Sequence, residues 1–512
     1  MPGLDQKVVD LIKAKRVIER IKIDVRTDFI VAPHYNAIFL KAGDYLWGRA
    51  QELLRSGNYV PALPHTISVP KERGFARPGS ILSPIDRFVY QALIDLASPA
   101  LEKQLDRTRT FSNVLSKKQG AMFEPAHEGW ERLQGKIAQL CAMGGFILKA
   151  DIANYFERIP QHHLVNLMNA AGCRPEVVNL IEEMLLAFQE RDSYGIIQGV
   201  FPSDVLGNFF LSEFDAYCEL HDLPSARYVD DIYIRYPTDF AARNGLISLT
   251  ERLRQNGLHL NEYKSGILTA TAVQREETQL DALFAAARQE VQRELTEGAP
   301  GGYGFNVEWE FDEPPTADDD LDLAAVERLY QAIGDNPKHA DKIEKYCLPL
   351  LRAAGSDVAV ASVLRHLPTN GHLSRLYYTY LTRFLNHAPL VRALEKLAQR
   401  PQMGTDFQRM YVLAALFSAK SISKGTVNLS LQWLENAQIA QEARAMAAVF
   451  AAKFGTGNQK RAVRLMYERE PSEYVRSAIL YSARYFSTPE KRACKKAWGG
   501  HTVVNSLVVQ AM

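Results

Sequence analysis

Two adjacent carboxylates stand in a segment that otherwise has the composition of a buried strand. The stretch SARYVDDIYIRYP, from Ser225 to Pro237, sets Asp230 and Asp231 among β-branched and aromatic residues. Burying one ionised carboxylate costs free energy, and burying two side by side costs more. A third carboxylate, Asp151, ends the apolar run GGFILKAD. Such a group of acids requires a compensating positive charge.

Magnesium can supply that charge. Three aspartates on neighbouring strands can hold two Mg²⁺ ions about 3.5–4 Å apart, and Mn²⁺ can substitute for Mg²⁺. One ion activates an attacking hydroxyl and the other stabilises a departing pyrophosphate, which is the chemistry of nucleotidyl transfer. An Asp-Asp pair alone is more often a turn-capping element, so this interpretation depends on the motifs around it.

The composition is that of a globular protein with more than one domain. Of the 512 residues, 47% are hydrophobic and 23% are charged. The five cysteines are scattered, with no CxxC spacing, so we expect reduced core residues and no zinc site or disulfide. No apolar run approaches a membrane span, and the N-terminus lacks the apolar core of a signal peptide. We expect a cytoplasmic protein without membrane contact.

The net charge of +1 conceals a segregation of charge along the chain. Residues 1–150 carry 22 Lys and Arg against 15 Asp and Glu, residues 151–350 carry 16 against 35, and residues 351–512 carry 22 against 9. An acidic middle suits metal binding, and basic flanks suit a partner that bears phosphates. A solvated acidic linker with ordinary surface charge elsewhere would give the same pattern.

Residues 1–298 show an α+β pattern. Residues 1–60 read as helical, and 61–85 as extended or looped. Ser83 is placed to cap a helix that has Pro84 in its first turn. Residues 144–152 are expected to form a strand, 225–237 a β-hairpin and 266–270 a short strand. Helices are expected over 160–172, 176–189, 203–221, 238–257 and 276–298.

From residue 321 to the end, the pattern is helix after helix with short breaks. The segment 299–320, rich in Gly, Pro and acidic residues, is expected to be a linker or crossover. Examples of the helical pattern that follows are 356–367, 388–400, 441–455 and 472–486. Such helices commonly stack as a HEAT-like solenoid, and a plain helical bundle is the alternative.

Five stretches in order resemble the motifs of reverse transcriptases. LKADIANYF resembles the first palm motif, IIQGVFPSDVLGNFFLSEFD the second, YVDD the third and GLHLNEYKSGIL the next. Upstream, VPKERGFARPGSILSPIDRFVYQALID resembles the fingers segment. The resemblance covers about residues 60–270 and implies an α+β right-hand polymerase with fingers and palm, followed by an all-α HEAT-like domain. The expected divisions are 1–60, 61–298, 299–320 and 321–512.

The resemblance assigns catalytic roles to four residues. Asp151 and Asp230 would bridge the metal ions and Asp231 would be the third carboxylate. Lys264 could protonate the departing pyrophosphate, although a lone loop lysine is as often simply solvated.

The resemblance also assigns the nucleotide site. Lys71 and Arg77 would neutralise the triphosphate, unless they are ordinary loop charges. Phe156, with Tyr155 as the neighbouring candidate, would lie under the sugar and exclude a ribose 2′-hydroxyl, so we expect dNTPs as substrates. The remaining pair, Gln198 and Gly199, would border the incoming nucleotide, with a plain turn as the alternative.

A small reverse transcriptase joined to helical repeats resembles the bacterial abortive-infection (Abi) class of defence-associated enzymes. That resemblance implies antiphage defence, a phage trigger and DNA synthesis without a template. It also implies priming by a protein hydroxyl, for which Tyr35 and Tyr45 are candidates, with single-stranded DNA left covalently attached. We also expect a homo-oligomer. The alternative hypotheses are a templated, retron-like enzyme and a catalytically inactive scaffold protein.

Overall fold

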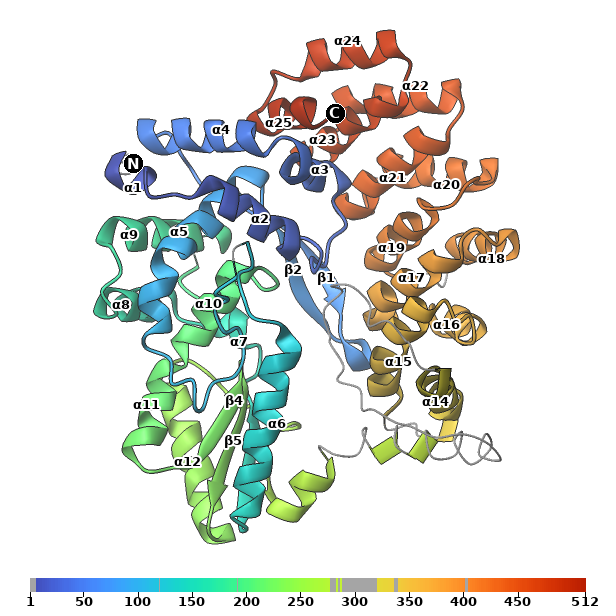
Figure 1. The fold of residues 1–512 in the computed structure, drawn as a ribbon. Helices are drawn as coiled ribbons and strands as arrows, with labels where there is room; N and C mark the ends of the chain where they lie inside the picture. Colours follow the sequence, from blue (N-terminus) through green and yellow to red (C-terminus); the bar gives the residue numbers. More distant parts are fainter. Residues whose placement is uncertain are drawn as a thin grey trace.

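The computed structural model describes residues 6–118, 120–190, 192–276, 282–283, 286–287, 320–335, 339–400 and 404–512. The first half of the described chain combines a central sheet with helices (Figure 1). The second half is a row of helices along one side of that body, from α14 at one end to α24 at the other. Within the described residues, no helix is long and apolar enough to cross a membrane.

The central sheet has four antiparallel strands. They are β3 (Phe146–Asp151), β4 (Ser225–Tyr228), β5 (Asp231–Tyr236) and β6 (Gly266–Thr269), in the order β4-β5-β3-β6. Side chains alternate between its faces. Ile232, Ile234 and Tyr236 join the main core, which also contains residues of α12 (Asp239–Gln255). Tyr233 lies on the other face, in a smaller cluster with Leu133 of α6 (Ala126–Ala142).

The main core continues around α5 (Pro84–Glu102), most of whose residues are buried. Ser83 caps this helix, because its hydroxyl accepts a hydrogen bond of 3.1 Å from the Asp86 amide. The shorter helices nearby are α7 (Tyr155–Arg158), α8 (Gln161–Ala170), α9 (Pro175–Phe188), α10 (Phe201–Phe210) and α11 (Ser212–Leu220).

The N-terminal part contributes four helices and a separate hairpin. The helices are α1 (Gln6–Val9), α2 (Ala14–Asp24), α3 (Pro33–Lys41) and α4 (Gly43–Ser56). The hairpin pairs β1 (His65–Pro70) with β2 (Ala76–Ile81), antiparallel. It was expected only to be extended or looped.

The C-terminal part is helical throughout its described length, as expected. We call residues 320–512 the helical region. Its helices are α14 (Asp320–Gln331), α15 (Ala340–Ala354), α16 (Val360–His366), α17 (Ser374–Leu381), α18 (Ala388–Ala398), α19 (Asp406–Leu416), α20 (Lys424–Glu435), α21 (Gln441–Phe454), α22 (Gly457–Met466), α23 (Glu473–Ser482), α24 (Thr488–Trp498) and α25 (Val503–Ala511).

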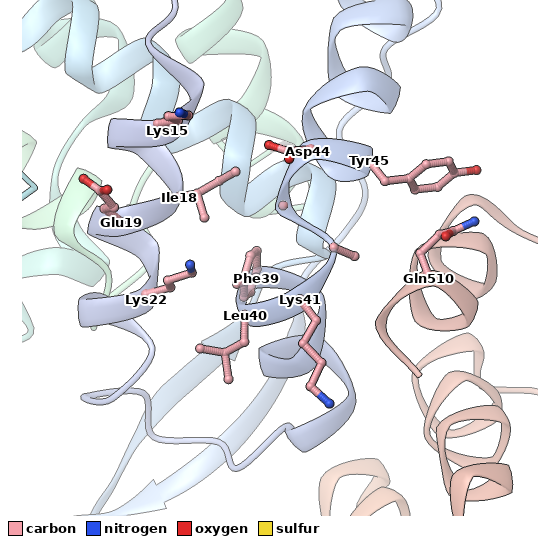
Figure 2. A pocket seen from close by; sticks show the side chains of 12 residues that line it. Lys15, Ile18, Glu19, Lys22, Phe39, Leu40, Lys41, Asp44, Tyr45 and Gln510 are labelled. Carbon is pink, nitrogen blue, oxygen red and sulfur yellow. The ribbon is translucent and has the colours of Figure 1, made fainter.

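The helical region packs back against the N-terminal part of the chain. Helix α25 lies against α3, and α19 lies against β1. His65 of β1 pairs with Glu442 of α21 and stacks on Tyr474 of α23. Where α2, α3 and α4 meet α25, they border an open cavity of about 430 Å³ lined in part by three lysines (Figure 2). These contacts join the two halves into one body.

Most elements expected from the sequence are present, with two differences. The expected helix over 203–221 is two helices, because the backbone at Leu211 leaves the helical region of φ and ψ (−84°, 6°). The first apolar stretch is likewise divided into α1 and α2. Most of the helix expected over 276–298, and all of the segment 299–320 except Asp320, lie outside the described residues. All five cysteines are buried, and none of them is in a disulfide.

The turn between β4 and β5 has an unusual backbone. Tyr228 pairs with Asp231, so the turn consists of Val229 and Asp230 alone. Val229 has φ of 54°, a left-handed conformation that a β-branched residue rarely adopts. Such a conformation persists only where surrounding contacts hold it. Here the Val229 amide donates to the Ser112 hydroxyl at 2.9 Å.

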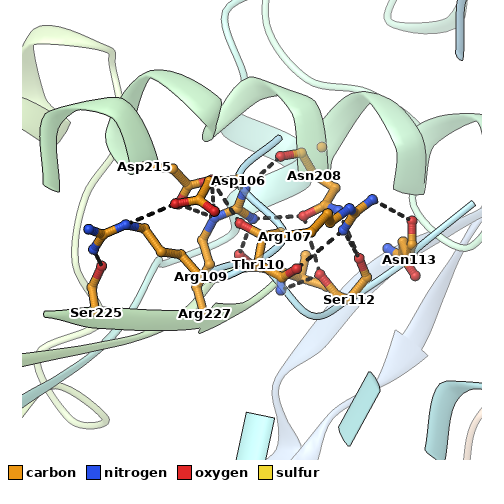
Figure 3. A network of polar contacts seen from close by, with 12 residues as sticks. Asp106, Arg107, Arg109, Thr110, Ser112, Asn113, Asn208, Asp215, Ser225 and Arg227 are labelled. Carbon is orange, nitrogen blue, oxygen red and sulfur yellow. Dashed lines mark hydrogen bonds and ion pairs between the residues drawn. The ribbon is translucent and has the colours of Figure 1, made fainter. Parts of the chain in front are cut away.

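A buried arginine holds the same turn (Figure 3). The Arg227 guanidinium, 1% exposed, donates to the Val229 carbonyl at 3.2 Å. It also donates to the Asp215 carboxylate of α11 at 2.6 Å and to the Asn208 side chain of α10 at 2.7 Å. Thr110 adds a bond to Asp215 of 2.8 Å. The network therefore ties α10, α11 and the turn into one unit.

Asp215→Ala should lower the free energy of unfolding by about 3–5 kcal/mol, because the Arg227 guanidinium is left buried without its carboxylate. Hydrogen exchange should show this locally, as lost amide protection in β4 and β5. The exposed pair of Arg243 and Asp239 gives the control, and Asp239→Ala should leave exchange in both strands unchanged. Equal protection in Asp215→Ala and the wild type would contradict this assignment.

Candidate active site

The three aspartates lie together at one end of the central sheet. Asp151, the last residue of β3, is directly opposite Asp231, the first residue of β5, across the antiparallel pair. Asp230 precedes Asp231 in the turn held by Arg227. Asp151 is 9% exposed, Asp230 is half-buried and Asp231 is exposed. The register of two strands thus brings together carboxylates about 80 residues apart in the sequence.

Crowding of negative charge marks this group. Burial, and the charges of Asp231 and Asp151, raise the pKa of Asp230 to about 7. Hydrogen bonding at its own backbone and the charge of Lys264 act in the opposite direction without overcoming the rise. Ionisation of all three aspartates is therefore unfavourable unless more positive charge is present.

Lys264 supplies a cation beside the aspartates. Its ammonium lies 3.0 Å from an Asp151 carboxylate oxygen. Burial alone would lower the pKa of Lys264, but its hydrogen bond to Asp151 and the charges of the three aspartates raise it. The side chain of Lys264 is 67% exposed, so this pair is screened by solvent.

The loop that carries Lys264 is fastened to the end of β3. The Asn261 amide donates to the Asp151 carbonyl at 2.8 Å, and the Asp151 amide donates to the Ser265 hydroxyl at 3.1 Å. The Ala153 amide donates to the His259 carbonyl at 2.8 Å. These bonds fix the backbone on both sides of Asp151, so the position of Lys264 relative to Asp151 is built into the fold.

The donor set suits a divalent cation. Carboxylate oxygens are ligands that Mg²⁺ and Mn²⁺ prefer, and a cation would relieve the repulsion that raises the pKa of Asp230. In the described part of the chain, no three His, Cys, Asp or Glu side chains are gathered closely enough to form a ready metal site. Cation binding here therefore requires the carboxylates to turn toward one another.

The two aromatic residues after Asp151 have different surroundings. Tyr155 is buried, and its hydroxyl donates to the Gly207 carbonyl at 2.5 Å. It therefore anchors α7 to α10. Phe156 is half-buried, and its carbonyl accepts the Ile196 amide at 2.8 Å. Of the two, Phe156 is the one exposed enough to contact a substrate.

The structure brings Arg77 of β2 and Gly199 together around a residue that the sequence did not single out, Phe29. The Arg77 guanidinium stacks on the Phe29 ring, 4.3 Å from its centroid. Gly199 has φ of +87°, and a Cβ there would lie 2.8 Å from the same ring. Gln198 precedes Gly199 and is half-buried.

Lys71 lies in the turn between β1 and β2, where its amide donates to the Phe75 carbonyl at 2.6 Å. Arg77 and Gly199 thus meet at Phe29, whereas Lys264 pairs with Asp151.

Sequence reasoning missed the residues that position these groups. Arg227 stands directly before YVDD, and a charged residue inside an apolar strand was a signal that it is paired. Asn208 and Asp215 belong to the second motif, but the motif does not say that they hold Arg227. Nothing local in the sequence distinguishes Phe29 from a core aromatic residue.

Comparison with known proteins gives one family match. Residues 69–293 match the family described as "Reverse transcriptase (RNA-dependent DNA polymerase)". No curated protein matches the chain.

Similar solved structures include two telomerases. The chain is similar to telomerase from Candida albicans in complex with a fragment of telomeric RNA, at 11% identity and TM-score 0.31, covering 78% of this chain and 65% of that one. It is also similar to apo telomerase from Candida tropicalis, at 10% identity and TM-score 0.30, covering 88% and 69%. TM-scores of this size establish no shared fold.

The matched residues contain the three aspartates, Lys264, Arg77 and Gly199. They also contain the antiparallel sheet that sets Asp151 opposite Asp231. The family match and the placement of the acids agree, and residues 69–293 are a reverse-transcriptase-like polymerase domain.

Proposed function

We propose that this protein is a DNA polymerase that adds deoxynucleotides to a growing strand by metal-assisted nucleotidyl transfer. The observation that supports it most directly is the register of β3 and β5, which sets Asp151 opposite Asp231 with Asp230 alongside. Metal-assisted phosphoryl transfer uses metal ions bound at one site, and carboxylates gathered at one end of a sheet can bind them. An inactive scaffold would have no use for three neighbouring aspartates when burial and the charges of the other two raise the pKa of Asp230.

Asp151, Asp230 and Asp231 would hold the divalent ions. Bound Mg²⁺ or Mn²⁺ supplies activation of the attacking hydroxyl and neutralises charge on the departing pyrophosphate. Lys264 would donate a proton to that pyrophosphate, and its bond to Asp151 keeps the ammonium beside the reacting phosphate. Half-buried Arg77 and the turn residue Lys71 would bind the triphosphate oxygens.

Phe156 would distinguish deoxyribose from ribose. It lies near the catalytic Asp151 in sequence, is half-buried, and packs edge to face against Tyr155 at 5.4 Å between ring centroids. Tyr155 is in turn fixed by its bond to Gly207. A ring held in this way can exclude a 2′-hydroxyl by contact alone, so we infer that the substrates are dNTPs.

We further propose template-independent, protein-primed synthesis in abortive-infection defence, with DNA left attached to protein. This finer assignment rests on the resemblance to Abi enzymes and on a basic helical region that packs beside the polymerase domain. A basic surface suits a single strand of DNA. Cytoplasmic location, a homo-oligomer and a phage trigger belong to the same proposal. The alternative is a templated, retron-like enzyme.

The two tyrosines considered for priming differ in access. Tyr35 is buried against His34 and Tyr474, and burial raises its pKa far above the ordinary value. Tyr45 is 39% exposed and lines the cavity of Figure 2, among α2, α3, α4 and α25. Of these two, only Tyr45 has a hydroxyl that a nucleotide could reach without local unfolding.

The template requirement can be tested directly. Purified protein with Mg²⁺ or Mn²⁺ and dNTPs, but without added nucleic acid, should yield DNA that migrates with protein through a denaturing gel. Chelation of the metal should stop the synthesis. Synthesis that begins only when template and primer are supplied would reject the Abi assignment in favour of the retron-like one, while leaving the polymerase assignment intact.

Asp230→Asn should reduce nucleotide incorporation at least about a hundredfold, because it removes charge from the centre of the carboxylate group. Circular dichroism and melting temperature should stay near wild type. Asp222→Asn is the matched control, because Asp222 is exposed and has φ of 49°, which asparagine tolerates. Wild-type incorporation by Asp230→Asn would refute the proposed site.

Phe156→Ala should admit ribonucleotides, lowering the preference for dNTPs about 10- to 100-fold in kcat/KM. Phe156→Tyr keeps the bulk of the ring and should keep the preference. Phe240→Ala, at a 74% exposed position on α12, controls for loss of a phenyl group elsewhere. Unchanged sugar discrimination in Phe156→Ala would remove Phe156 as the gate.

A further inference from the structure

The loop between α2 and α3, residues 25–32, contacts Arg77 and Gly199, Arg87 of α5, and the helical region. We call it the α2–α3 loop. It touches the expected nucleotide-binding residues on one side and the helical region on another, and Phe29 stands at its centre. No motif of the polymerase domain includes this loop, which precedes the matched residues 69–293.

Phe29 stabilises the cation of Arg77. The guanidinium carbon lies 4.3 Å from the ring centroid, within the range of a cation–π interaction. Among the described residues, the buried Nε of Arg77 has no hydrogen-bond partner. Burial also lowers the pKa of Arg77. The ring thus holds a guanidinium whose remaining donors are available to an anion.

The same ring also touches Gly199. A Cβ at Gly199 would lie 2.8 Å from Phe29 Cε2, so the backbone of the second motif rests directly on the ring. Two residues on, the Phe201 amide donates to Asp24 at the end of α2, at 3.1 Å. The ring edge and the Asp24 carboxylate therefore fix the segment that is expected to border the incoming nucleotide.

A buried ion-pair network secures the start of the α2–α3 loop. Arg87 of α5 binds Asp24 at 2.7 Å and Asp28 at 3.0 Å. Its side chain is 3% exposed, and such a pair has little freedom to move once formed. Asp28 is adjacent to Phe29, so this network holds the backbone next to the residue whose ring contacts Gly199.

The helical region holds the backbone of the same loop. Arg375 of α17 donates to the Arg26 and Thr27 carbonyls at 2.5 and 2.8 Å. The Tyr411 hydroxyl of α19 donates to the Phe29 carbonyl at 3.1 Å. Met410 sulfur accepts the Val31 amide at 3.3 Å. Helices α17 and α19, about 350 residues later in the sequence, thus hydrogen-bond to the backbone of Phe29 and its neighbours.

We propose that Phe29 is a positioning residue for the triphosphate of the incoming nucleotide, and that the helical region sets nucleotide affinity through the α2–α3 loop. The ring orients Arg77 and supports Gly199, while Arg375 and Tyr411 hold the backbone of the loop that carries the ring. This inference rests on the proposed polymerase function, because it assumes that Arg77 binds the triphosphate. It assigns the helical region an effect on the nucleotide site without contact with the aspartates.

The ring is tested by two substitutions at Phe29. Phe29→Leu keeps apolar bulk but removes the π face, and should raise the KM for dNTPs about 3- to 30-fold with kcat within about threefold. Phe29→Tyr keeps the ring and should stay within about twofold of wild type. A purely structural role would instead lower the melting temperature and affect both variants through kcat. Equal KM values for Phe29→Leu and wild type would overturn the proposal.

The connection to the helical region is tested by a double-mutant cycle. Arg375→Met should raise KM about 3- to 10-fold in the wild type but add little in Phe29→Leu, because both changes release the same ring. Arg352 is the matched control, because it donates to the Thr379 carbonyl within the helical region at 3.0 Å. Arg352→Met should leave KM unchanged. Fully additive effects of Arg375→Met and Phe29→Leu would overturn the connection.

Direct binding separates this inference from the proposed function. Titration calorimetry with a dNTP should show weaker binding to Phe29→Leu than to wild type by the same factor as the change in KM. Wild-type protein that neither binds nor incorporates dNTPs would refute the polymerase assignment. Wild-type protein that binds dNTPs no better than Phe29→Leu would refute the role of Phe29 and leave the polymerase assignment intact.

Discussion

The candidate active site depends on one buried cation, the guanidinium of Arg227. It lies between α10, α11 and the β4–β5 turn, and binds Asp215, Asn208 and the Val229 carbonyl. A cation in this environment is stable only with its partners in place, so the network forms completely or not at all. Its bond to the Val229 carbonyl helps to hold Val229 in a left-handed conformation and thereby fixes the backbone that carries Asp230. The second and third motifs of the polymerase domain are therefore joined by one hydrogen-bond network.

The sequence was sufficient to predict features encoded by local patterns. The strand ending at Asp151, the hairpin around Asp230 and the cap at Ser83 follow from alternation, turn chemistry and capping, and each is present. The division of the 203–221 helix at Leu211 was not predictable, because apolar residues on both sides of the break continue the helical pattern. The break is decided by tertiary packing that brings Asp215 to Arg227.

The proposed nucleotide site shows where prediction from motifs ends. Arg77 and Gly199 were expected to bind the same ligand, but the residue that joins them, Phe29, comes from outside every motif. Contacts between residues 29, 77, 199, 375 and 411 exist only after the chain has folded, and no local spacing encodes them. The carboxylates are likewise placed by register, but their arrangement around a cation depends on how their side chains turn, which no motif encodes.

The hydrogen bonds from α17 and α19 to the α2–α3 loop have a consequence for biosynthesis. Ribosomes complete the N-terminal part first, and domains generally fold in that order. The palm sheet can close once residue 269 has emerged, but Arg375 and Tyr411 reach the loop only after more than a hundred further residues. In a nascent chain the three aspartates would thus be in place well before the α2–α3 loop is held by the helical region. Translation itself would then delay the proposed nucleotide binding until α17 and α19, which hold the α2–α3 loop, have been made.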